Sequence, residues 1–406
     1  MYRPELVLPA GTLEKLKTAF LFGADAVYLA GKEYGLRAAA GNLTLPEISE
    51  GLIFARQFGG RLYVTVNVLA RNQDLHHLPA YLEELAERGV DGLIISDPGV
   101  LRLASRYAPE VPVTISTQAS ISNYEAAAFY RELGAKRLVL ARELTLEEIL
   151  AIKSRVDVEI EMFIHGAMCV SYSGRCLLSS YMTGRSANQG ECAHPCRYSY
   201  ALVEEKRPGE YFAIEEDGRG TYILNSRDLC LLEYVPQLIE GGIDAFKVEG
   251  RMKSPLYVAS VARVYRQAID SYRNNPRPYS PQQLEDWLKE LQSTATRPFT
   301  TGFINGPNNL QDAAKQVLPR SDFCGVLLDY DPQRSMLEVE QRANFGPGDD
   351  LEWMLPGGEI KSFTLEELYD EEGHKMDRAR HARQRVYIPY PDRLPQYSIL
   401  RRRPSF

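Results

Sequence analysis

The 406-residue sequence has no run of 18 apolar residues and none of the short motifs that mark the common catalytic folds. A transmembrane helix is not expected, because a span needs such a run. The first residues, MYRPELVLPAG, lack a basic segment followed by an apolar stretch, so we expect no secretion signal and predict a cytoplasmic location. The motifs H-E-x-x-H, G-x-S-x-G, G-x4-G-K-[ST] and G-x-G-x-x-G are also missing, which removes the usual signatures of zinc proteases, serine hydrolases and nucleotide-binding proteins.

Histidine and positive charge are also scarce. The chain has six histidines and a net charge of −7, with a pI of about 5.6. The field of the whole chain therefore opposes non-specific binding to nucleic acid, and an RNA partner would require a local basic patch.

A short phrase recurs along the first 250 residues, as GADAVYLAG at 23, GVDGLIISD at 89, GAKRLVLAR at 134 and GIDAFKVEG at 242. In each copy a glycine that suits a helix end precedes a short apolar strand of the kind buried on both faces. The predicted strands lie near residues 5–8, 25–30, 61–67, 91–96, 112–117, 137–142, 157–164 and 244–249. Eight strands alternating with helices favour an α/β fold of the TIM-like (β/α)8 barrel type, with an open doubly wound sheet as the alternative.

The pattern changes near residue 320, where apolar and polar residues alternate between turn signals such as DYDP and GPGDD. We predict a barrel domain over 1–320 and a small C-terminal β-barrel over 321–406. The barrel domain carries an insertion between its seventh and eighth strands, at about 165–243.

Four of the six cysteines lie close together in that insertion, with six, fifteen and three residues between Cys169, Cys176, Cys192 and Cys196. In a reducing compartment such a group indicates a metal or redox site rather than disulfides. Only the last two have zinc-like spacing, so an iron–sulfur cluster is favoured over a structural zinc site or buried packing. Cys230 is an alternative fourth ligand, whereas Cys324 is expected in the core of the C-terminal domain.

Polar residues follow the predicted strands at the end where barrel enzymes place their active sites. Each could instead form a structural salt bridge, for example Arg142 with Glu249. We predict catalytic roles for His165, Glu249 and Asn67. The predicted substrate-binding residues are Arg37, Arg142, Arg251, Lys247 and Gln118.

The insertion and the residues after strand eight also carry basic and aromatic side chains. Arginine and lysine contact phosphates, and an unpaired base can stack on an aromatic ring. The basic candidates are Arg175, Arg185, Arg197, Lys206, Arg207, Arg251 and Lys253, and the aromatic ones are Tyr172, Tyr181, Tyr198 and Tyr200.

Several stretches resemble the collagenase-like peptidase family U32: EMFIHGAMCVSYSGRCLLSSYMTGR, NQGECAHPCRYSY, NSRDL and FKVEGRMKSPLYVA. The similarity covers the barrel and reaches into the C-terminal domain, and RPGEY before NSRDL is similar to the tRNA hydroxylation branch. That resemblance implies formation of 5-hydroxyuridine at the wobble position in the tRNA anticodon loop, without molecular oxygen and with prephenate as co-substrate. It also implies a 4Fe-4S cluster on Cys169, Cys176, Cys192 and a varying fourth ligand, here Cys196.

Two other activities stay open. Relatives in the family hydroxylate ribosomal RNA or ubiquinone precursors, and the family name implies a peptidase. For a peptidase the sequence offers no recognisable nucleophile and base pair. If prephenate is the co-substrate, its two carboxylates require cations with planar geometry, and Arg37, Arg142 and Arg251 lie at suitable strand ends.

Overall fold

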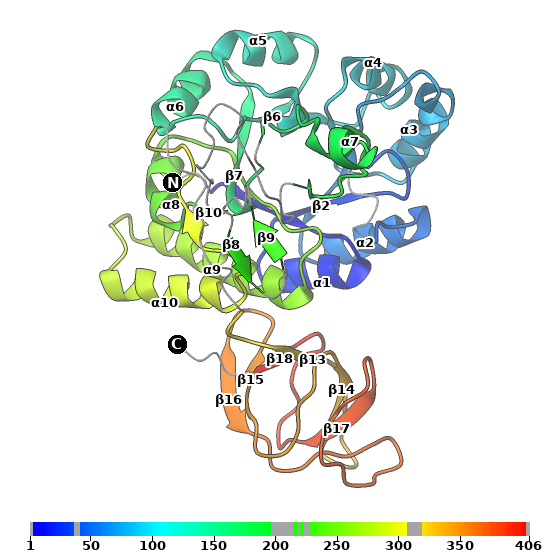
Figure 1. Cartoon of the computed structure of the whole chain (residues 1–406), viewed down its shortest axis with the longest axis vertical. Helices are drawn as coiled ribbons and strands as arrows, with labels where there is room; N and C mark the ends of the chain where they lie inside the picture. The colour runs from blue at the N-terminus through cyan, green and yellow to red at the C-terminus, as the bar shows by residue number, and fades with distance from the viewer. Residues whose placement is uncertain are drawn as a thin grey trace, which may run out of the picture.

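The computed structural model contains a closed parallel barrel surrounded by helices and a separate antiparallel sheet near the C-terminus (Figure 1). The structure describes residues 3–35, 41–169, 171–195, 215–217, 220–222, 227–306 and 319–402. Within these ranges, no helix combines the length and the apolar character needed to cross a membrane. The cytoplasmic location stays a prediction.

Eight strands pair in parallel and in sequence order, and the last one closes the ring by pairing with both β7 and β1. Their bounds are β1 Glu5–Pro9, β2 Ala26–Ala30, β3 Arg61–Val66, β4 Gly92–Ile95, β5 Val113–Ile115, β6 Arg137–Val139, β7 Glu159–Ala167 and β11 Ala245–Val248. The (β/α)8 prediction is confirmed. The open-sheet alternative is wrong, because the first and last strands pair with each other.

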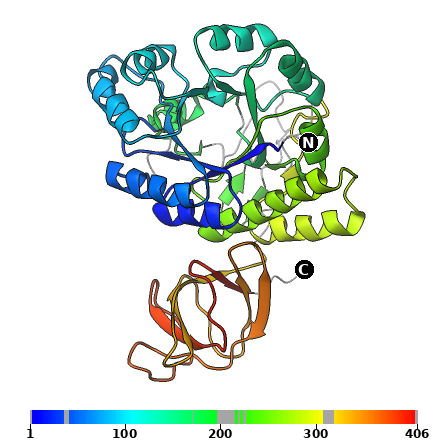
Figure 2. The same cartoon turned by 180° about the vertical axis from the view of Figure 1, so that it is seen from behind.

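Helices surround this ring on the outside (Figure 2). Their bounds are α1 Leu13–Leu21, α2 Leu45–Gln57, α3 Leu78–Glu87, α4 Pro98–Tyr107, α5 Tyr124–Glu132, α6 Leu146–Arg155, α8 Val235–Glu240, α9 Pro255–Asn274 and α10 Pro281–Ser293. Reciprocal capping boxes begin α2 at Thr44 and α6 at Thr145. The glycines of the recurring phrase follow their helices with φ from +71° to +115°, as the sequence predicts.

The segment between β7 and β11 adds elements that the sequence did not predict. It contains α7 (Leu178–Thr183), the hairpin strands β8 (Glu215–Asp217) and β9 (Gly220–Tyr222), and β10 (Asp228–Cys230). Strand β10 runs antiparallel to the end of β7, and β12 (Phe299–Thr300) pairs beside it. The C-terminal end of β7 therefore pairs with a strand on each side, β10 on one and β11 on the other.

The C-terminal sheet is antiparallel, in the order β16-β15-β18-β13-β14-β17. Its strands are β13 Phe323–Asp331, β14 Met336–Gln341, β15 Asp350–Met354, β16 Ile360–Thr364, β17 Arg385–Pro389 and β18 Ile399–Arg402. They wrap around their own apolar core, which includes Trp353 and, as predicted, Cys324. Over residues 319–402 no ladder joins β16 to β17, so the sheet is a half-barrel. The predicted boundary at 320 and 321 adjoins residues outside the described ranges and stays a prediction.

Candidate active site

A cavity of about 200 Å³ lies where the barrel strands end. Side chains from inside six strands form its floor: Tyr28, Thr65, Ile94, Val139, Phe163 and Lys247. Its walls come from the loops that follow the strands and from the segment Ala167–Pro195, which carries three cysteines. Barrel enzymes place their chemistry at this end of the strands, so this cavity is the candidate active site.

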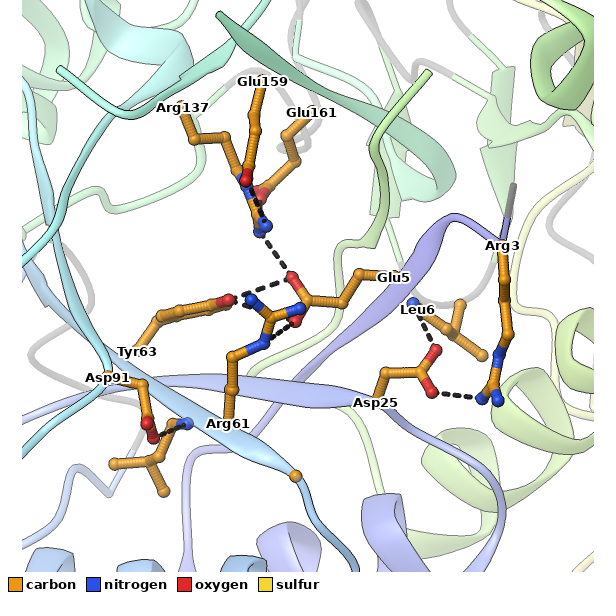
Figure 3. A network of polar contacts seen from close by, with 12 residues as sticks. Arg3, Glu5, Leu6, Asp25, Arg61, Tyr63, Asp91, Arg137, Glu159 and Glu161 are labelled. Carbon is orange, nitrogen blue, oxygen red and sulfur yellow. Dashed lines mark hydrogen bonds and ion pairs between the residues drawn. The ribbon is translucent and has the colours of Figure 1, made fainter. Parts of the chain in front are cut away.

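A buried ion network fills the barrel below the cavity (Figure 3). Arg137, at the start of β6, lies 2.5 Å from a Glu5 oxygen and 3.1 Å from a Glu161 oxygen. The ammonium group of Lys247 lies 2.5 Å from the other Glu161 oxygen. Burial alone would raise the pKa of Glu161, but Lys247 and Arg137 outweigh it and lower that pKa. The network therefore fixes Lys247 at the cavity floor and neutralises part of its charge.

Arg142 presents a different kind of cation to the cavity. Its guanidinium donates to the carbonyl oxygen of Ala167 and to the hydroxyl oxygen of Ser173, both at 2.8 Å, and its central carbon lies 5.1 Å from the centre of the Phe163 ring. All of these partners are neutral. Arg142 forms no ion pair with any residue that the structure describes, so the alternative pairing with Glu249 is wrong. No described carboxylate is close enough to pair with it, so its charge can attract an anion in the cavity.

Glu249 and Arg251 follow β11 and line the same cavity. The Tyr28 hydroxyl lies 3.0 Å from the Val248 carbonyl oxygen and 3.3 Å from a Glu249 carboxylate oxygen, which orients that carboxylate from β2. Arg251 is 3% exposed and donates a short hydrogen bond to the side-chain oxygen of Asn42. The structure therefore brings Glu249, Arg251 and Lys247 together, as predicted.

Asn67 and Gln118 meet on the opposite wall, also as predicted. The Asn67 amide nitrogen donates to the Gln118 side-chain oxygen at 2.6 Å, and the Ser116 hydroxyl donates to the same oxygen at 3.0 Å. Gln118 belongs to a short 3-10 turn, Thr117–Ala119, that follows β5. These side chains carry no formal charge, so this wall differs chemically from the wall that carries Arg142.

Cys169, Cys176 and Cys192 all line the cavity, are partly exposed and form no disulfide. Their sulfur atoms do not belong to any group of described ligand atoms that all lie within 4.8 Å of one another. One zinc ion binds sulfur at about 2.3 Å and needs a tighter set. A cluster of several irons suits wider spacing, because each thiolate binds a different iron. The donor set thus fits an iron–sulfur cluster.

The cysteine segment is anchored over the barrel mouth by hydrogen bonds to other loops. The Leu69 amide, after β3, donates to the Asn188 carbonyl at 3.0 Å, and the Asn188 side chain donates to the Cys176 carbonyl at 3.3 Å. The Ser120 hydroxyl, after β5, donates to the Ser173 carbonyl at 3.2 Å. These bonds hold Cys176 and Arg142's partner Ser173 against the barrel.

His165 does not reach the cavity, which is a correction to its predicted catalytic role. Alternation along β7 places residue 165 on the inner face with Glu161 and Phe163. A register shift against β11 follows Phe163, so His165 pairs with Val248 and the alternation is broken. His165 is 2% exposed and packs against Tyr265, and burial, assisted by the charge of Lys253, lowers its pKa to about 3.

Cys230, the alternative fourth ligand, also lies away from the cavity. It is buried on β10 opposite His165, and its sulfur is 3.8 Å from the Tyr265 hydroxyl oxygen. Burial raises the pKa of its thiol to about 11, which disfavours the thiolate that an iron would bind. The structure does not bring Cys230 to the other three cysteines.

Some predicted residues lie outside the described ranges. They are Arg37, Cys196, Arg197, Tyr198, Tyr200, Lys206 and Arg207. Their roles stay predictions.

Several cavity residues escaped the sequence reasoning, among them the strand residues Tyr28 and Thr65 and, directly after β5, Ser116. They lie within or directly after short strands whose residues are nearly all buried, so periodicity alone cannot separate inward from outward side chains. The sequence does offer one signal for these residues, which is a hydroxyl group in or beside an otherwise apolar strand. A buried hydroxyl needs a hydrogen-bond partner or a ligand, so it marks a possible site residue.

The surface of the cysteine segment exposes large side chains beside the mouth of the cavity. Leu177 is 71% exposed and Tyr181 is 87% exposed, and Tyr172 and Met182 are each about half exposed, at 47% and 45%. Arg175 and Arg185 are exposed on the same segment. Lys253 instead contacts the Thr296 hydroxyl at 3.1 Å, away from the cavity lining.

Comparisons with known proteins match both parts of the chain. The model of Peptidase family U32 matches residues 11–313, and the model of the Peptidase family U32 C-terminal domain matches residues 319–401. The tRNA hydroxylation protein P1 of Bacillus subtilis is 42% identical over 98% of this chain and 95% of its own length. The tRNA hydroxylation protein P of Escherichia coli is 35% identical over 99% of this chain and 97% of its own length.

A third relative, the 23S rRNA 5-hydroxycytidine synthase of Escherichia coli, is 38% identical over 87% of this chain and 53% of its own length. The two family models together match residues 11–313 and 319–401, which include most of the barrel and nearly all of the C-terminal sheet. The chain belongs to peptidase family U32.

Proposed function

We propose that this protein hydroxylates RNA and forms 5-hydroxyuridine at the wobble position of tRNA. The observation that carries the proposal is the composition of one cavity, where three cysteines and the unneutralised Arg142 meet. Support comes from the relatives, because two are named tRNA hydroxylation proteins and one forms a hydroxylated pyrimidine in ribosomal RNA.

Cys169, Cys176 and Cys192, with Cys196 as the fourth ligand, would hold a 4Fe-4S cluster at the cavity wall. Such a cluster supplies one-electron chemistry or a Lewis-acidic iron beside the substrate. The protein's own contribution is to present three partly exposed thiols on a segment that is hydrogen-bonded to two neighbouring loops.

The cations of the cavity, Arg142, Arg251 and Lys247, would bind the dicarboxylate prephenate, the co-substrate of a hydroxylation that needs no molecular oxygen. Arg142 is the principal anion contact because its described partners are all neutral, and Arg251 is placed to assist it. Lys247 contributes less, because Glu161 lies 2.5 Å from its ammonium group. Glu249, oriented by Tyr28, is the cavity carboxylate suited to exchange a proton with a bound substrate.

The anticodon loop would approach over the cysteine segment. Arg175 and Arg185 can contact phosphates there, and Tyr181 or Tyr172 can stack on an unpaired base. Binding should weaken steeply as salt rises, because phosphate contacts release counterions.

The test expresses the protein in a bacterial strain that lacks its own wobble-uridine hydroxylases and analyses tRNA nucleosides by mass spectrometry. Wild type should restore 5-hydroxyuridine. Cys169→Ala, Cys176→Ala and Cys192→Ala should lose both iron and product, whereas Cys230→Ala and Cys324→Ala should keep both. Arg142→Leu should keep its iron but bind prephenate about ten- to a hundred-fold more weakly, the cost of one charge-assisted bidentate contact.

Arg131→Leu, on the exposed end of α5, is the matched control and should behave like wild type. Retention of iron in all three cysteine variants would contradict the cluster. Absence of 5-hydroxyuridine with wild type would contradict the proposed product and favour another substrate, such as ribosomal RNA or a ubiquinone precursor.

A thiol peptidase is the second candidate, and one contact favours it. The Cys192 sulfur lies 3.9 Å from the Nδ1 atom of His194, and both residues line the cavity. A cysteine beside a histidine is the arrangement of a thiol nucleophile with its base. Hydrolysis of denatured collagen that disappears in both Cys192→Ala and His194→Gln would support this activity over hydroxylation.

A further inference from the structure

The cavity has one wall without formal charge, formed by Thr65, Asn67, Ser116 and Gln118, which we call the amide wall. Thr65 lies on β3, Asn67 follows β3, and Ser116 and Gln118 follow β5. This is the side away from Lys247, on β11, and Arg251, which follows β11. A dianion would be held by the cations, so the amide wall is left for a neutral part of the substrate. A neutral base is read through hydrogen bonds to its polar edge.

The Gln118 amide is placed with its oxygen toward two neighbours. Its oxygen accepts from the Asn67 amide nitrogen at 2.6 Å and from the Ser116 hydroxyl at 3.0 Å. An amide oxygen that accepts two hydrogen bonds leaves the NH2 group of the same side chain as the free end. No residue in the described ranges accepts a hydrogen bond from that nitrogen. Gln118 therefore offers a donor, rather than an acceptor, to the cavity.

Thr65 supplies a second unmatched polar atom on the same wall. It is 3% exposed, and its hydroxyl has no hydrogen-bond partner among the described residues. Thr65 lies on β3 and Asn67 follows that strand directly, and both residues line the cavity. Buried polar atoms without partners are rare and costly, and a ligand that contacts this wall would supply the missing partner.

We propose that Gln118 selects the target pyrimidine by donating a hydrogen bond to a carbonyl oxygen at its 4-position. Uridine has that carbonyl, whereas cytidine has an amino group, which is itself a donor. Two donors facing each other leave both unsatisfied, and a site built for one hydrogen bond rejects an analogue that cannot make it. The inference rests on the proposed function and adds the residue that distinguishes uridine from cytidine. The distinction matters because one relative is named as a 5-hydroxycytidine synthase.

The experiment measures binding of two RNA hairpins that carry the anticodon loop and differ only by U or C at the wobble position. Fluorescence anisotropy gives Kd at one fixed salt concentration for iron-loaded wild type, Gln118→Glu and Gln57→Glu. Glutamate keeps the shape of glutamine: one carboxylate oxygen can still accept from Asn67 and Ser116, and the other turns the cavity donor into an acceptor. Gln57 is exposed on α2 and controls for the added negative charge.

Wild type and Gln57→Glu should prefer the U hairpin by about three- to ten-fold, the range expected for one hydrogen bond. Gln118→Glu should lose or reverse that preference, whatever its overall affinity. An unchanged U-to-C ratio in Gln118→Glu, or equal binding of both hairpins by wild type, overturns the role of Gln118 and leaves the proposed function standing. Failure of wild type to bind either hairpin more tightly than an unrelated RNA overturns the proposed function itself.

Discussion

At the scale of single residues, a cation that lines the cavity attracts an anion strongly only if no nearby carboxylate already pairs with it. Lys247 and Arg142 both line the cavity, and strand position alone gives them equal standing. Glu161 lies 2.5 Å from the Lys247 ammonium, whereas the contacts of Arg142 with described residues are a carbonyl, a hydroxyl and a ring. An ion pair already formed attracts a further anion weakly, so Arg142 rather than Lys247 decides anion binding.

His165 gives a prediction on stability and pH. Burial, with a smaller contribution from Lys253, lowers the pKa of His165 from 6.5 to about 3. Between these two pH values the unfolded chain binds a proton that the folded protein does not, so folding stability falls as pH decreases. The slope approaches about 1.4 kcal/mol per pH unit. Urea unfolding at pH 7, 6 and 5 should show this loss.

His165→Phe, which keeps an aromatic ring beside Tyr265, should reduce the slope between pH 6 and pH 5. His77→Gln, an exposed position, serves as the control and should retain it. An identical slope in His165→Phe and wild type would show that another group takes up the proton.

At the scale of elements, alternation along a strand predicts side-chain direction until the register shifts. Glu161 and Phe163 point into the barrel, as period-two alternation requires. The shift against β11 then turns His165 toward α9. Sequence alone could not reveal it, because the shift depends on pairing with a strand about 80 residues further along. The strand-end rule, by contrast, correctly placed Asn67, Gln118, Arg142 and Glu249.

The end of β7 also gives a prediction on backbone fit. Gly166 has φ +106°, and a β-carbon at this position would lie 2.3 Å from the Glu249 carbonyl oxygen. Gly134 has φ +93°, but its β-carbon would meet no atom within 4 Å. Gly134→Ala should therefore cost about 1 kcal/mol for the backbone conformation alone, whereas Gly166→Ala should cost roughly 3 kcal/mol or more because β7 and β11 must separate.

Chemical unfolding of the two alanine variants measures the difference. Because Glu249 would move with the backbone, Gly166→Ala should also lose product formation at temperatures where it remains folded. Equal destabilisation by the two substitutions would mean that the mouth of the barrel tolerates the displacement.

At the scale of the whole molecule, the barrel was predictable because its signal is repeated. Four copies of one phrase and eight apolar strands indicate the ring. Each strand is a separate piece of evidence for the barrel, so an error in one does not change the fold prediction. The sequence placed a cysteine-bearing insertion between β7 and β11 but not β10 or β12, which are two or three residues long and depend on the edge of β7. Short strands carry too few residues for a periodic pattern.

Arg401, a residue 2% exposed on β18, makes one of the contacts between the barrel and the C-terminal sheet. Its guanidinium makes two hydrogen bonds with Glu290 of α10, at 2.7 and 3.0 Å, and one with Glu352 of β15, at 3.0 Å. Removing the cation would take the shortest ion-pair contact from the buried Glu290, which would keep only the longer pair with Arg263 at 3.6 Å among the described residues, and would also remove the Arg401 contact of Glu352. Arg401→Met should therefore destabilise the protein by about 3–5 kcal/mol. Arg380→Met, which breaks an exposed pair with Asp377, is the control and should leave the free energy of unfolding nearly unchanged.

The two tryptophans make the origin of that loss measurable, because Trp287 lies on α10 and Trp353 lies in the core of the C-terminal sheet. Trp287→Phe and Trp353→Phe each leave one tryptophan as a fluorescent probe, so urea unfolding can be followed separately in the two parts.

In the wild-type background the two transitions should coincide, because the buried ion pairs couple the barrel to the sheet. In the Arg401→Met background they should separate, with the sheet unfolding at the lower urea concentration, because the smaller part has the smaller apolar core. Coincident transitions after Arg401→Met would show that other contacts, such as the Arg342–Glu14 pair at 2.6 Å, maintain the coupling without Arg401.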